Sequence, residues 1–229
     1  MKPLLSIIVI LALCTISCKK DKTDNNNNSN ATTVTDIDGN SYKTVTIGTQ
    51  VWMAENLKVT HYRNGDAIPN ITDSAQWSSL TTGAYCIYNN SSGNGTIYGK
   101  LYNWYAVNDS RNIAPTGWHV STDADWATLT TALGGDQVAG GKLKETGLNH
   151  WQNPNISATN EVGFTAIPGG TRNFNGAFND IGHYSYWWSF TANNTSGNDY
   201  DRSINNNSGL LYRNSNKEGV GYSVRCVKD

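Results

Sequence analysis

Residues 114–126, Ala114-Pro115-Thr116-Gly117-Trp118-His119-Val120-Ser121-Thr122-Asp123-Ala124-Asp125-Trp126, contain a turn, a short apolar segment and the start of a helix. Pro115 and Gly117 are residue types that favour a turn. The apolar segment that follows them is predicted to be extended. Thr122, followed three residues later by Asp125, forms a capping signature that predicts a helix start.

The spacing of apolar residues after Thr122 predicts the rest of this helix. Trp126, Leu129 and Leu133 recur at helical intervals, so they share one face. Gly134-Gly135 is expected to end the helix, because glycine readily adopts the left-handed conformation that follows a last turn. We interpret this segment as a scaffold, a rigid floor for loops that lie further along the chain.

The composition predicts one polar, turn-rich domain after a short leader. The chain has 229 residues, of which 22 are glycine and only 15% are charged. Its 8 tryptophans and 12 tyrosines supply bulk for a core. The formal net charge is -1 and no basic cluster occurs, so nucleic acid is excluded as a predicted partner.

Residues 1–17 are predicted to be a lipoprotein signal peptide. Lys2 precedes an apolar run at 4–13, which is too short to span a membrane as a helix. Thr15-Ile16-Ser17-Cys18 resembles a bacterial lipobox, in which the cysteine becomes the lipidated first residue of the mature protein. This resemblance implies that Cys18 carries an acyl anchor that inserts into the lipid bilayer. A buried N-terminal helix is the alternative interpretation.

Residues 18–33 are predicted to be a flexible, Asn-rich tether. This segment has almost no apolar side chains whose burial would offset the entropy cost of ordering. Lys19-Lys20-Asp21 is similar to the charged signals that send lipoproteins of the Bacteroidetes to the cell surface. The similarity implies an outer-membrane lipoprotein displayed on the cell surface, with the periplasmic face as the alternative.

Cys86 and Cys226 remain for the folded domain if Cys14 and Cys18 belong to the leader and anchor. An even pair of cysteines in an exported protein predicts one disulfide. Two buried free thiols are the alternative.

The rest of the pattern predicts an α+β fold with long loops, including 89–95 and 60–80, where a helical turn near 73–80 is the alternative to continuous loop. Hairpin strands are expected at 34–38 and 41–47, around Gly39-Asn40. A short amphipathic helix is expected at 101–107, before the helix that follows Thr122. Strands are expected at 184–190, 200–204, 209–213 and 220–227. The last of these alternates apolar and other residues, which indicates one buried face.

A set of runs in this sequence is also familiar as a family pattern. These are Asp36-Ile37-Asp38-Gly39-Asn40, Gln50-Val51-Trp52-Met53-Ala54-Glu55-Asn56-Leu57, Tyr98-Gly99-Lys100-Leu101-Tyr102-Asn103-Trp104, Gly117-Trp118-His119-Val120, Gly141-Lys142-Leu143-Lys144-Glu145 and Ser223-Val224-Arg225-Cys226-Val227. They resemble the Fibrobacter succinogenes major paralogous domain, which occurs in exported and often lipid-anchored proteins. The resemblance implies that residues 34–229 form one such domain. The family's biochemical role is unassigned, so it implies no activity.

A more distant similarity concerns the helix and the last strand. Residues 120–126, Gly134-Gly135 and Tyr222-Ser223-Val224-Arg225-Cys226 are similar to formylglycine-generating sulfatase-modifying enzymes. This implies a C-type-lectin-like fold, with two helices packed on a twisted antiparallel sheet and long functional loops. Those enzymes use a reactive cysteine pair, whereas the corresponding run here, residues 209–214, has no cysteine. Because thiol-dependent oxidation needs a thiolate, the chain is predicted not to be an enzyme.

The histidines and aspartates predict no catalytic or required metal site. His61, His119, His150 and His183 are scattered without metal-ligand spacing, so each is interpreted as a loop or core residue, and His119 has no visible partner. Asp199 and Asp201 could hold calcium near a strand start, although such clusters are more often solvated loop tips. No cofactor is therefore expected, with calcium as the alternative.

Aromatic and amide side chains gather in the loops between 140 and 208. Sugar sites typically combine an aromatic platform with polar side chains that bond to hydroxyls. The candidate ligand-binding residues are Trp151, Phe174, His183, Tyr186 and Trp187. Strand alternation places Trp187 on the opposite face from Tyr184, Tyr186, Trp188 and Phe190. Trp188 is interpreted as core, whereas Trp151 and Trp187 are left open between core packing and ligand binding.

We therefore expect a non-catalytic recognition or adhesion module for a glycan or protein ligand. The alternative is an enzyme related to the sulfatase-modifying factors, with an unrecognised active site in the 140–208 loops. The sequence shows no nucleophile–base pair or metal-ligand spacing there, which favours the module.

Replacement of the predicted lipid attachment residue tests the anchor hypothesis. In a bacterial host that processes lipoproteins, we expect Cys18→Ala to abolish incorporation of radiolabelled palmitate, because its thiol is the acyl acceptor. Cys14→Ala is the matched control and should be labelled like the unchanged protein. Labelling that survives Cys18→Ala would refute the assignment.

Overall fold

The computed structural model describes residues 32–193 and 197–229. The predicted signal peptide, Cys18 and nearly all of the predicted tether lie outside the described residues. The strands are β1 Thr33–Thr35, β2 Ser41–Ile47, β3 Gln50–Met53, β4 Tyr85–Cys86, β5 Leu101–Tyr102, β6 Trp118–Val120, β7 Thr171–Arg172, β8 Phe178–Asn179, β9 Tyr184–Trp188, β10 Asn198–Asn205, β11 Tyr212–Lys217 and β12 Cys226–Lys228. The helices are α1 Ser74–Ser78, α2 Ser92–Tyr98, α3 Trp104–Val107, α4 Asp123–Ala132 and α5 Asp136–Leu143, with a 3-10 turn η1 at Tyr88–Asn90.

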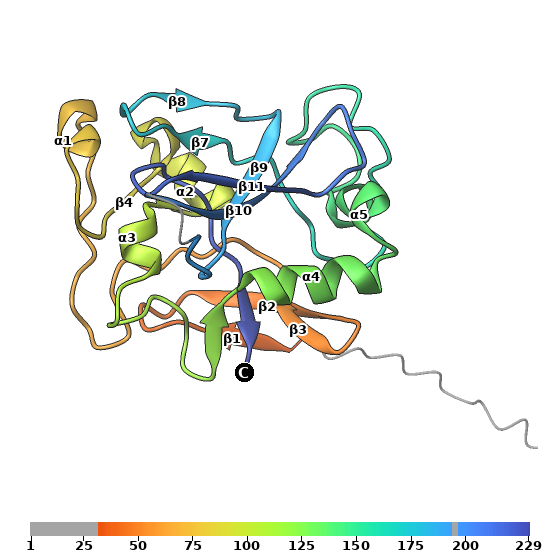
Figure 1. The fold of residues 1–229 in the computed structure, drawn as a ribbon, viewed down its shortest axis with the longest axis horizontal. Helices are drawn as coiled ribbons and strands as arrows, with labels where there is room; N and C mark the ends of the chain where they lie inside the picture. The colour runs from red at the N-terminus through yellow and green to blue at the C-terminus, as the bar shows by residue number, and fades with distance from the viewer. Residues whose placement is uncertain (1–31, 194–196) are drawn as a thin grey trace, which may run out of the picture. The chain divides into compact units, whose positions relative to one another are not determined.

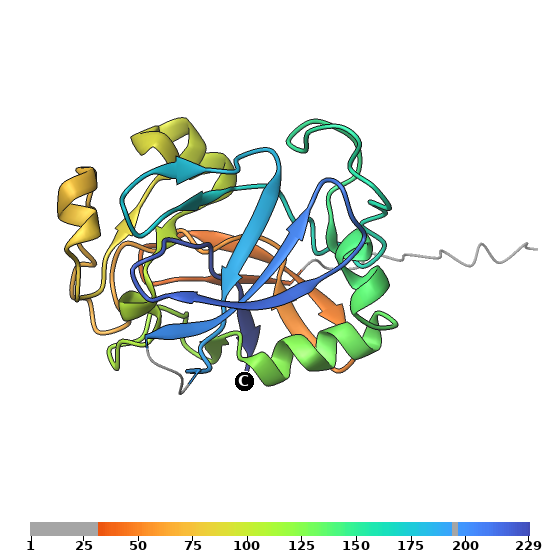
Figure 2. The same cartoon turned by 45° about the horizontal axis from the view of Figure 1, so that its top comes forward.

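These elements confirm an α+β fold with antiparallel sheets. One sheet has the strand order β1-β2-β3-β12-β6, and a second has the order β11-β10-β9. The C-terminal strand β12 lies between β3 and β6, so the two ends of the domain share one sheet. The second sheet and the β7–β8 hairpin lie on the same side of the first sheet (Figures 1 and 2).

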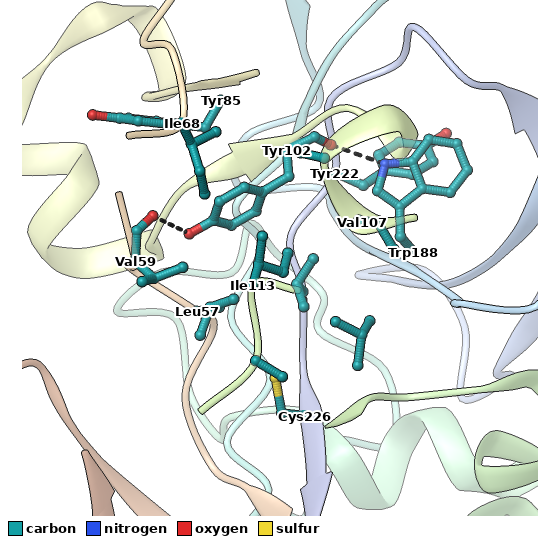
Figure 3. Close-up of a cluster of buried hydrophobic side chains, with 14 of the residues drawn as sticks. Leu57, Val59, Ile68, Tyr85, Tyr102, Val107, Ile113, Trp188, Tyr222 and Cys226 are labelled. Carbon is teal, nitrogen blue, oxygen red and sulfur yellow. Dashed lines mark hydrogen bonds between the residues drawn. The ribbon is translucent and has the colours of Figure 1, made fainter. Parts of the chain in front are cut away.

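Each face of the five-stranded sheet packs against a separate buried cluster. On one face, Trp52 and Val227 pack with the apolar side of α4 and with Trp187 from β9. On the other face, Met53 and Cys226 belong to a cluster with Tyr102. Figure 3 shows this second cluster, in which the Tyr102 hydroxyl donates to the Val59 carbonyl at 2.7 Å and the Trp188 indole N–H donates to the Tyr102 carbonyl at 2.9 Å.

The capped start of α4 is confirmed in detail. The Thr122 hydroxyl accepts a hydrogen bond from the Asp125 N–H at 3.1 Å, and the Asp125 carboxylate accepts one from the Thr122 N–H at 2.8 Å. Trp126, Leu129 and Leu133 are all buried, as the spacing predicts. The helix ends in a Schellman motif, in which the Gly135 N–H bonds to the Thr130 carbonyl.

The same helix start ties several elements together. His119 does have partners, because its ring nitrogens lie 3.0 Å from Asp125 Oδ2 and 2.7 Å from Asp229 Oδ1. Asp123 Oδ1 accepts hydrogen bonds from Arg202 at 2.7 Å and from Arg213 at 2.8 Å. Because these arginines lie on β10 and β11, the N-terminus of α4 is joined to the three-stranded sheet.

Several local predictions differ from the structure. The strand predicted at 209–213 is β11 at Tyr212–Lys217, and the strand predicted at 220–227 is β12 at Cys226–Lys228, which contains only the end of the predicted range. Residues 89–95, predicted to be loop, contain most of η1 and the start of α2. The helix predicted at 101–107 begins only at Trp104, because Leu101 and Tyr102 pair with β4 and the Asn103 side chain caps the helix by accepting from the Ala106 N–H. The hydrophobic spacing alone could not predict that Leu101 and Tyr102 pair with β4.

The structure contradicts the predicted disulfide between Cys86 and Cys226. Cys86 and Cys226 are both buried free thiols. Cys86 lies on β4 in a cluster with Trp77 and Leu101, whereas Cys226 lies on β12 in the cluster with Tyr102, so the two side chains belong to different cores. Burial raises the pKa of the Cys86 thiol to about 12, which keeps it protonated and unreactive.

Buried basic side chains hold the long loops. Arg225 is 0% exposed, and its guanidinium donates to the Met53 carbonyl at 2.8 Å, the Phe164 carbonyl at 3.0 Å and the Asn56 side-chain oxygen at 2.8 Å. Lys144 is also 0% exposed, and its ammonium donates to the loop carbonyls of Ile156 and Ser208 and to that of Asn205 at the end of β10. These bonds supply donors to carbonyls in loops and at strand ends.

Among residues 32–193 and 197–229, no helix has the length and apolar character needed to cross a bilayer.

Removal of the α4 cap should lower stability measurably. We expect Thr122→Ala to reduce the free energy of unfolding by about 1 kcal/mol, because the Asp125 N–H loses its acceptor. Thr128→Ala, at an exposed position of the same helix, should have little effect. Urea unfolding of both variants measures the difference, and equal midpoints would contradict the capping role.

Candidate functional site

A polar pocket forms where the β7–β8 hairpin meets β9, β11 and the segment before β12. We call it the tyrosine pocket. Its volume is about 350 Å³, and its lining residues are Thr171, Asn173, Asn179, Asp180, Tyr186, Asn216, Val220 and Tyr222. Side chains from positions more than forty residues apart thus meet in one concave site.

A stack of tyrosine rings forms the rigid side of this pocket. The Tyr186 ring lies 5.3 Å from Tyr184 and 4.8 Å from Tyr222, with interplanar angles of 7° and 11°. Trp188 packs on the far side of Tyr222, with ring centroids 4.7 Å apart. Because each ring is held by its neighbours, the edges that line the pocket have fixed positions.

A hydrogen bond orders the Tyr186 hydroxyl and the Asp180 carboxylate. The Tyr186 hydroxyl donates to Asp180 Oδ2 at 3.0 Å. Burial, and then the nearby Asp180 carboxylate, raise the pKa of Tyr186, so the hydroxyl keeps its proton at neutral pH. Asp180 therefore presents a carboxylate whose orientation is fixed.

The buried Asp201 side chain orients the Asn216 amide of the pocket. Asp201 is 0% exposed and accepts hydrogen bonds from the side-chain amides of Asn216 at 2.8 Å and Asn214 at 3.4 Å. The Asn216 side-chain N–H₂ is therefore directed to Asp201, and its carbonyl oxygen has no partner among the described residues. Burial raises the pKa of Asp201 to about 6.

The pocket offers both hydrogen-bond donors and acceptors to a ligand. Amide groups of Asn173, Asn179 and Asn216 lie in one lining with the Asp180 carboxylate. Asn179 is exposed, and its side chain makes no hydrogen bond to another described residue. This set suits a ligand that carries several hydroxyl groups, because the Asn179 amide can both donate and accept, the Asn173 N–H₂ can donate, and the Asn216 oxygen can accept.

Three of the predicted ligand-binding residues remain accessible. Tyr186 lines the pocket, and Phe174 lies in the β7–β8 turn with 44% of its surface exposed. The Lys217 ammonium lies 3.9 Å from the centroid of the Phe174 ring. His183 is exposed in the turn before β9 but does not line the pocket.

Trp151 and Trp187 are not accessible to a ligand, which corrects their place among the candidates. They are 1% and 0% exposed, and both belong to the cluster beneath α4. The Trp151 indole N–H donates to the Ala166 carbonyl at 2.9 Å, and that of Trp187 donates to the Asn56 side-chain oxygen at 3.0 Å. Trp188 is core, as predicted.

Asp199 and Asp201 are not solvated loop tips. Both lie on β10, and they are 3% and 0% exposed. Asp199 accepts a hydrogen bond from the Asn193 N–H at 3.0 Å. Within the described ranges, no group of three or more His, Cys, Asp or Glu side chains is arranged to hold a metal ion.

Sequence reasoning missed most of the pocket. The candidates did not include Asn173, Asn179, Asp180 or Asn216, because asparagine is abundant throughout this chain and no local pattern distinguishes these four positions. Tyr222 was also not a candidate, although it had a usable signal, since it shares its alternating face with Val220 and Val224. The pairing of the last segment with β7 and β9 brings these residues together.

Comparison with known proteins gives one family. The profile of the Fibrobacter succinogenes major domain matches residues 45–228, which is most of the chain. Searches of curated proteins and of solved structures found no match.

Asp201 should make stability depend on pH. Since folding raises the pKa of Asp201 from 3.8 to about 6, its favourable contribution is complete below pH 3.8 and is lost as pH rises through about 6. We expect Asp201→Asn to remove this loss. As the pH rises from 4 to 7.5, the free energy of unfolding of the variant should therefore increase by about 2–3 kcal/mol relative to that of the unchanged protein. Urea unfolding at both pH values measures this gain, and a difference that does not change with pH would contradict the assignment.

Proposed function

We propose that this chain, which belongs to the Fibrobacter succinogenes major domain family, is a non-catalytic recognition module that binds a glycan in the tyrosine pocket. The observation that carries the proposal is the convergence of Asn173, Asn179, Asn216 and Asp180 beside fixed tyrosine edges in one pocket. Glycan sites combine such amide and carboxylate groups with aromatic surfaces.

Phe174 supplies the aromatic platform in this proposal. It is the half-exposed ring of the β7–β8 turn, next in sequence to Asn173, which lines the pocket. The Lys217 side chain over this ring is flexible, so an apolar sugar face can replace it or use the opposite ring face. The sugar hydroxyls would then reach the amides of the pocket.

The proposal includes a C-type-lectin-like arrangement and a place in the cell envelope. Two observations are consistent with the arrangement: α4 and α5 pack on antiparallel strands, and β12 lies beside β3. The lipobox at Cys18 supports an outer-membrane lipoprotein displayed on the cell surface, held in the bilayer by its acyl chain, with display on the periplasmic face as the alternative. A protein ligand at the same pocket is the alternative partner.

One arrangement favours the second candidate, an enzyme with its site in the 140–208 loops. His150 Nδ1 lies 2.8 Å from Glu145 Oε2, which is the orientation of a general base and its positioning carboxylate. No serine, threonine or cysteine side chain of the described residues is hydrogen-bonded to this histidine. We therefore rank catalysis second.

A glycan array followed by titration tests the recognition module. The full chain is screened with and without calcium, and a bound glycan is then titrated against Asn179→Ala. We expect at least a tenfold loss of affinity, because the ligand loses a hydrogen-bonding amide whose removal disturbs no contact within the protein. Asn175→Ser is the control, since Asn175 lies in the turn that leads into β8 but does not line the pocket.

The array also separates the alternatives. Binding that appears only with calcium would support the cation alternative, and binding that Phe174→Ala abolishes would support the platform. A silent array, or glycan binding unchanged in Asn179→Ala, would overturn the proposed site. A silent array combined with turnover of a substrate that His150→Gln abolishes would favour the enzyme.

A further inference from the structure

A second pocket lies around the side chain of Arg225. Its volume is about 330 Å³, and it is bounded by the residues after β3, by α2, by the loop that carries Glu145 and His150, and by the loop that carries Thr165 and Ile167. We call it the Arg225 pocket. It shares no lining residue with the tyrosine pocket.

The guanidinium of Arg225 places a buried positive charge beneath the surface of this pocket. It is 0% exposed, and no Asp or Glu of the described chain lies within ion-pair distance of it. Its Nη2 makes one long hydrogen bond, 3.4 Å to the Thr165 carbonyl, so a second N–H of this nitrogen has no partner among the described residues. A buried charge of this kind favours an anionic or carbonyl oxygen as a partner.

Glu145 provides a negative group in the same lining. Its Oε2 lies 2.8 Å from His150 Nδ1, and its Oε1 has no partner within the described ranges. The other glutamate of the pocket, Glu55, is already used, because it bonds to the Lys43 N–H at 3.2 Å and to the Lys58 ammonium at 3.4 Å. Glu145 is therefore the carboxylate that is available to a ligand.

The histidine beside Glu145 is held in place. The His150 ring packs edge-on against Tyr98, with ring centroids 5.8 Å apart. With one ring nitrogen directed to Glu145, the imidazole fixes the orientation of the carboxylate. This side of the pocket is therefore ordered before any ligand arrives.

The remaining wall is apolar. Ile97 of α2 lines the pocket with 47% of its surface exposed, and Ala54 and Ile167 contribute further apolar surface. An isoleucine that is half exposed at the mouth of a pocket loses contact with water when an apolar ligand group covers it. The pocket thus combines a cation, an anion and an apolar surface.

We propose that the Arg225 pocket binds an amino acid with an apolar side chain, either free or as the first residue of a peptide. The buried guanidinium of Arg225 attracts the carboxylate or first carbonyl through its charge, the ammonium donates to Glu145, and the side chain covers Ile97. The volume of about 330 Å³ equals about eleven water molecules of 30 Å³, which is sufficient for one such residue. This inference is independent of the glycan proposal, because the two pockets use different residues.

Calorimetric titration of the full chain with leucine and its analogues tests the inference. We expect saturable binding of L-leucine and at least tenfold weaker binding of N-acetyl-leucine, which lacks the ammonium, and of leucinol, which lacks the carboxylate. Leu-Gly-Gly identifies the source of the ligand: it binds as tightly as leucine if a peptide N-terminus is recognised and not at all if the free amino acid is recognised. No saturable binding of leucine or Leu-Gly-Gly, or N-acetyl-leucine binding as tightly as leucine, would overturn the proposal.

Matched variants locate the binding in this pocket. Glu145→Gln is expected to weaken binding at least tenfold, whereas Glu161→Gln, which removes the same charge from an exposed pair with Lys142, should leave it unchanged. Ile97→Ser should weaken binding, and Val138→Ser, at a similarly exposed helical position, should not. Leucine affinity that is unchanged by both Glu145→Gln and Ile97→Ser would overturn the assignment. The leucinol measurement tests the attraction by the Arg225 charge without a substitution that could unfold the protein.

Discussion

The hydrogen bonds of the buried Arg225 guanidinium are the interaction on which the rest of the structure depends. They join the end of β3 and the nearby Asn56 side chain to the loop at Phe164, which lies more than one hundred residues further along the chain. Asn56 extends the connection, because its oxygen also accepts from the Trp187 indole and its amide donates to the Tyr98 carbonyl. The buried Arg172 acts in the same way elsewhere, donating to the carbonyls of Gly176 and Thr72. A domain with few charges and many loops thus uses buried cations to satisfy backbone that has no regular secondary structure.

This arrangement also explains why the two pockets form where they do. The segment before β12 contributes Tyr222 to the tyrosine pocket and Arg225 to the Arg225 pocket. Its pairing with β7 and β9 brings the tyrosine stack together, and the hydrogen bonds of Arg225 place the loops of the second pocket. Loops that carry both pockets are therefore positioned by a rigid core, which is the usual relation between scaffold and binding surface.

The sequence was sufficient for local elements whose signals are themselves local. The Thr122–Asp125 cap, the apolar face of α4 and the alternation of Tyr184–Trp188 required only neighbouring residues, and all three are found in the structure. The burial of Trp187 and of Arg225 could not be predicted in this way, because it depends on a second layer that covers the other strand face. The single buried face expected for the last strand likewise did not indicate that Arg225 is buried and bonded to oxygens of three other segments. The disulfide prediction was wrong for a related reason, since an even number of cysteines does not indicate which buried clusters the two thiols occupy.

Equilibrium unfolding of an Arg225→Met variant tests most directly whether the buried guanidinium holds this fold together. Removal of the guanidinium takes a donor from the buried Met53 and Phe164 carbonyls and leaves the Asn56 side-chain oxygen with the Trp187 indole as its remaining donor. We predict that the free energy of unfolding in urea falls by about 3 kcal/mol or more. Arg111→Met, which removes an arginine from a surface ion-pair cluster, is the control and should unfold close to the unchanged protein. A loss of less than about 1 kcal/mol for Arg225→Met, the size of an ordinary substitution, would contradict this account.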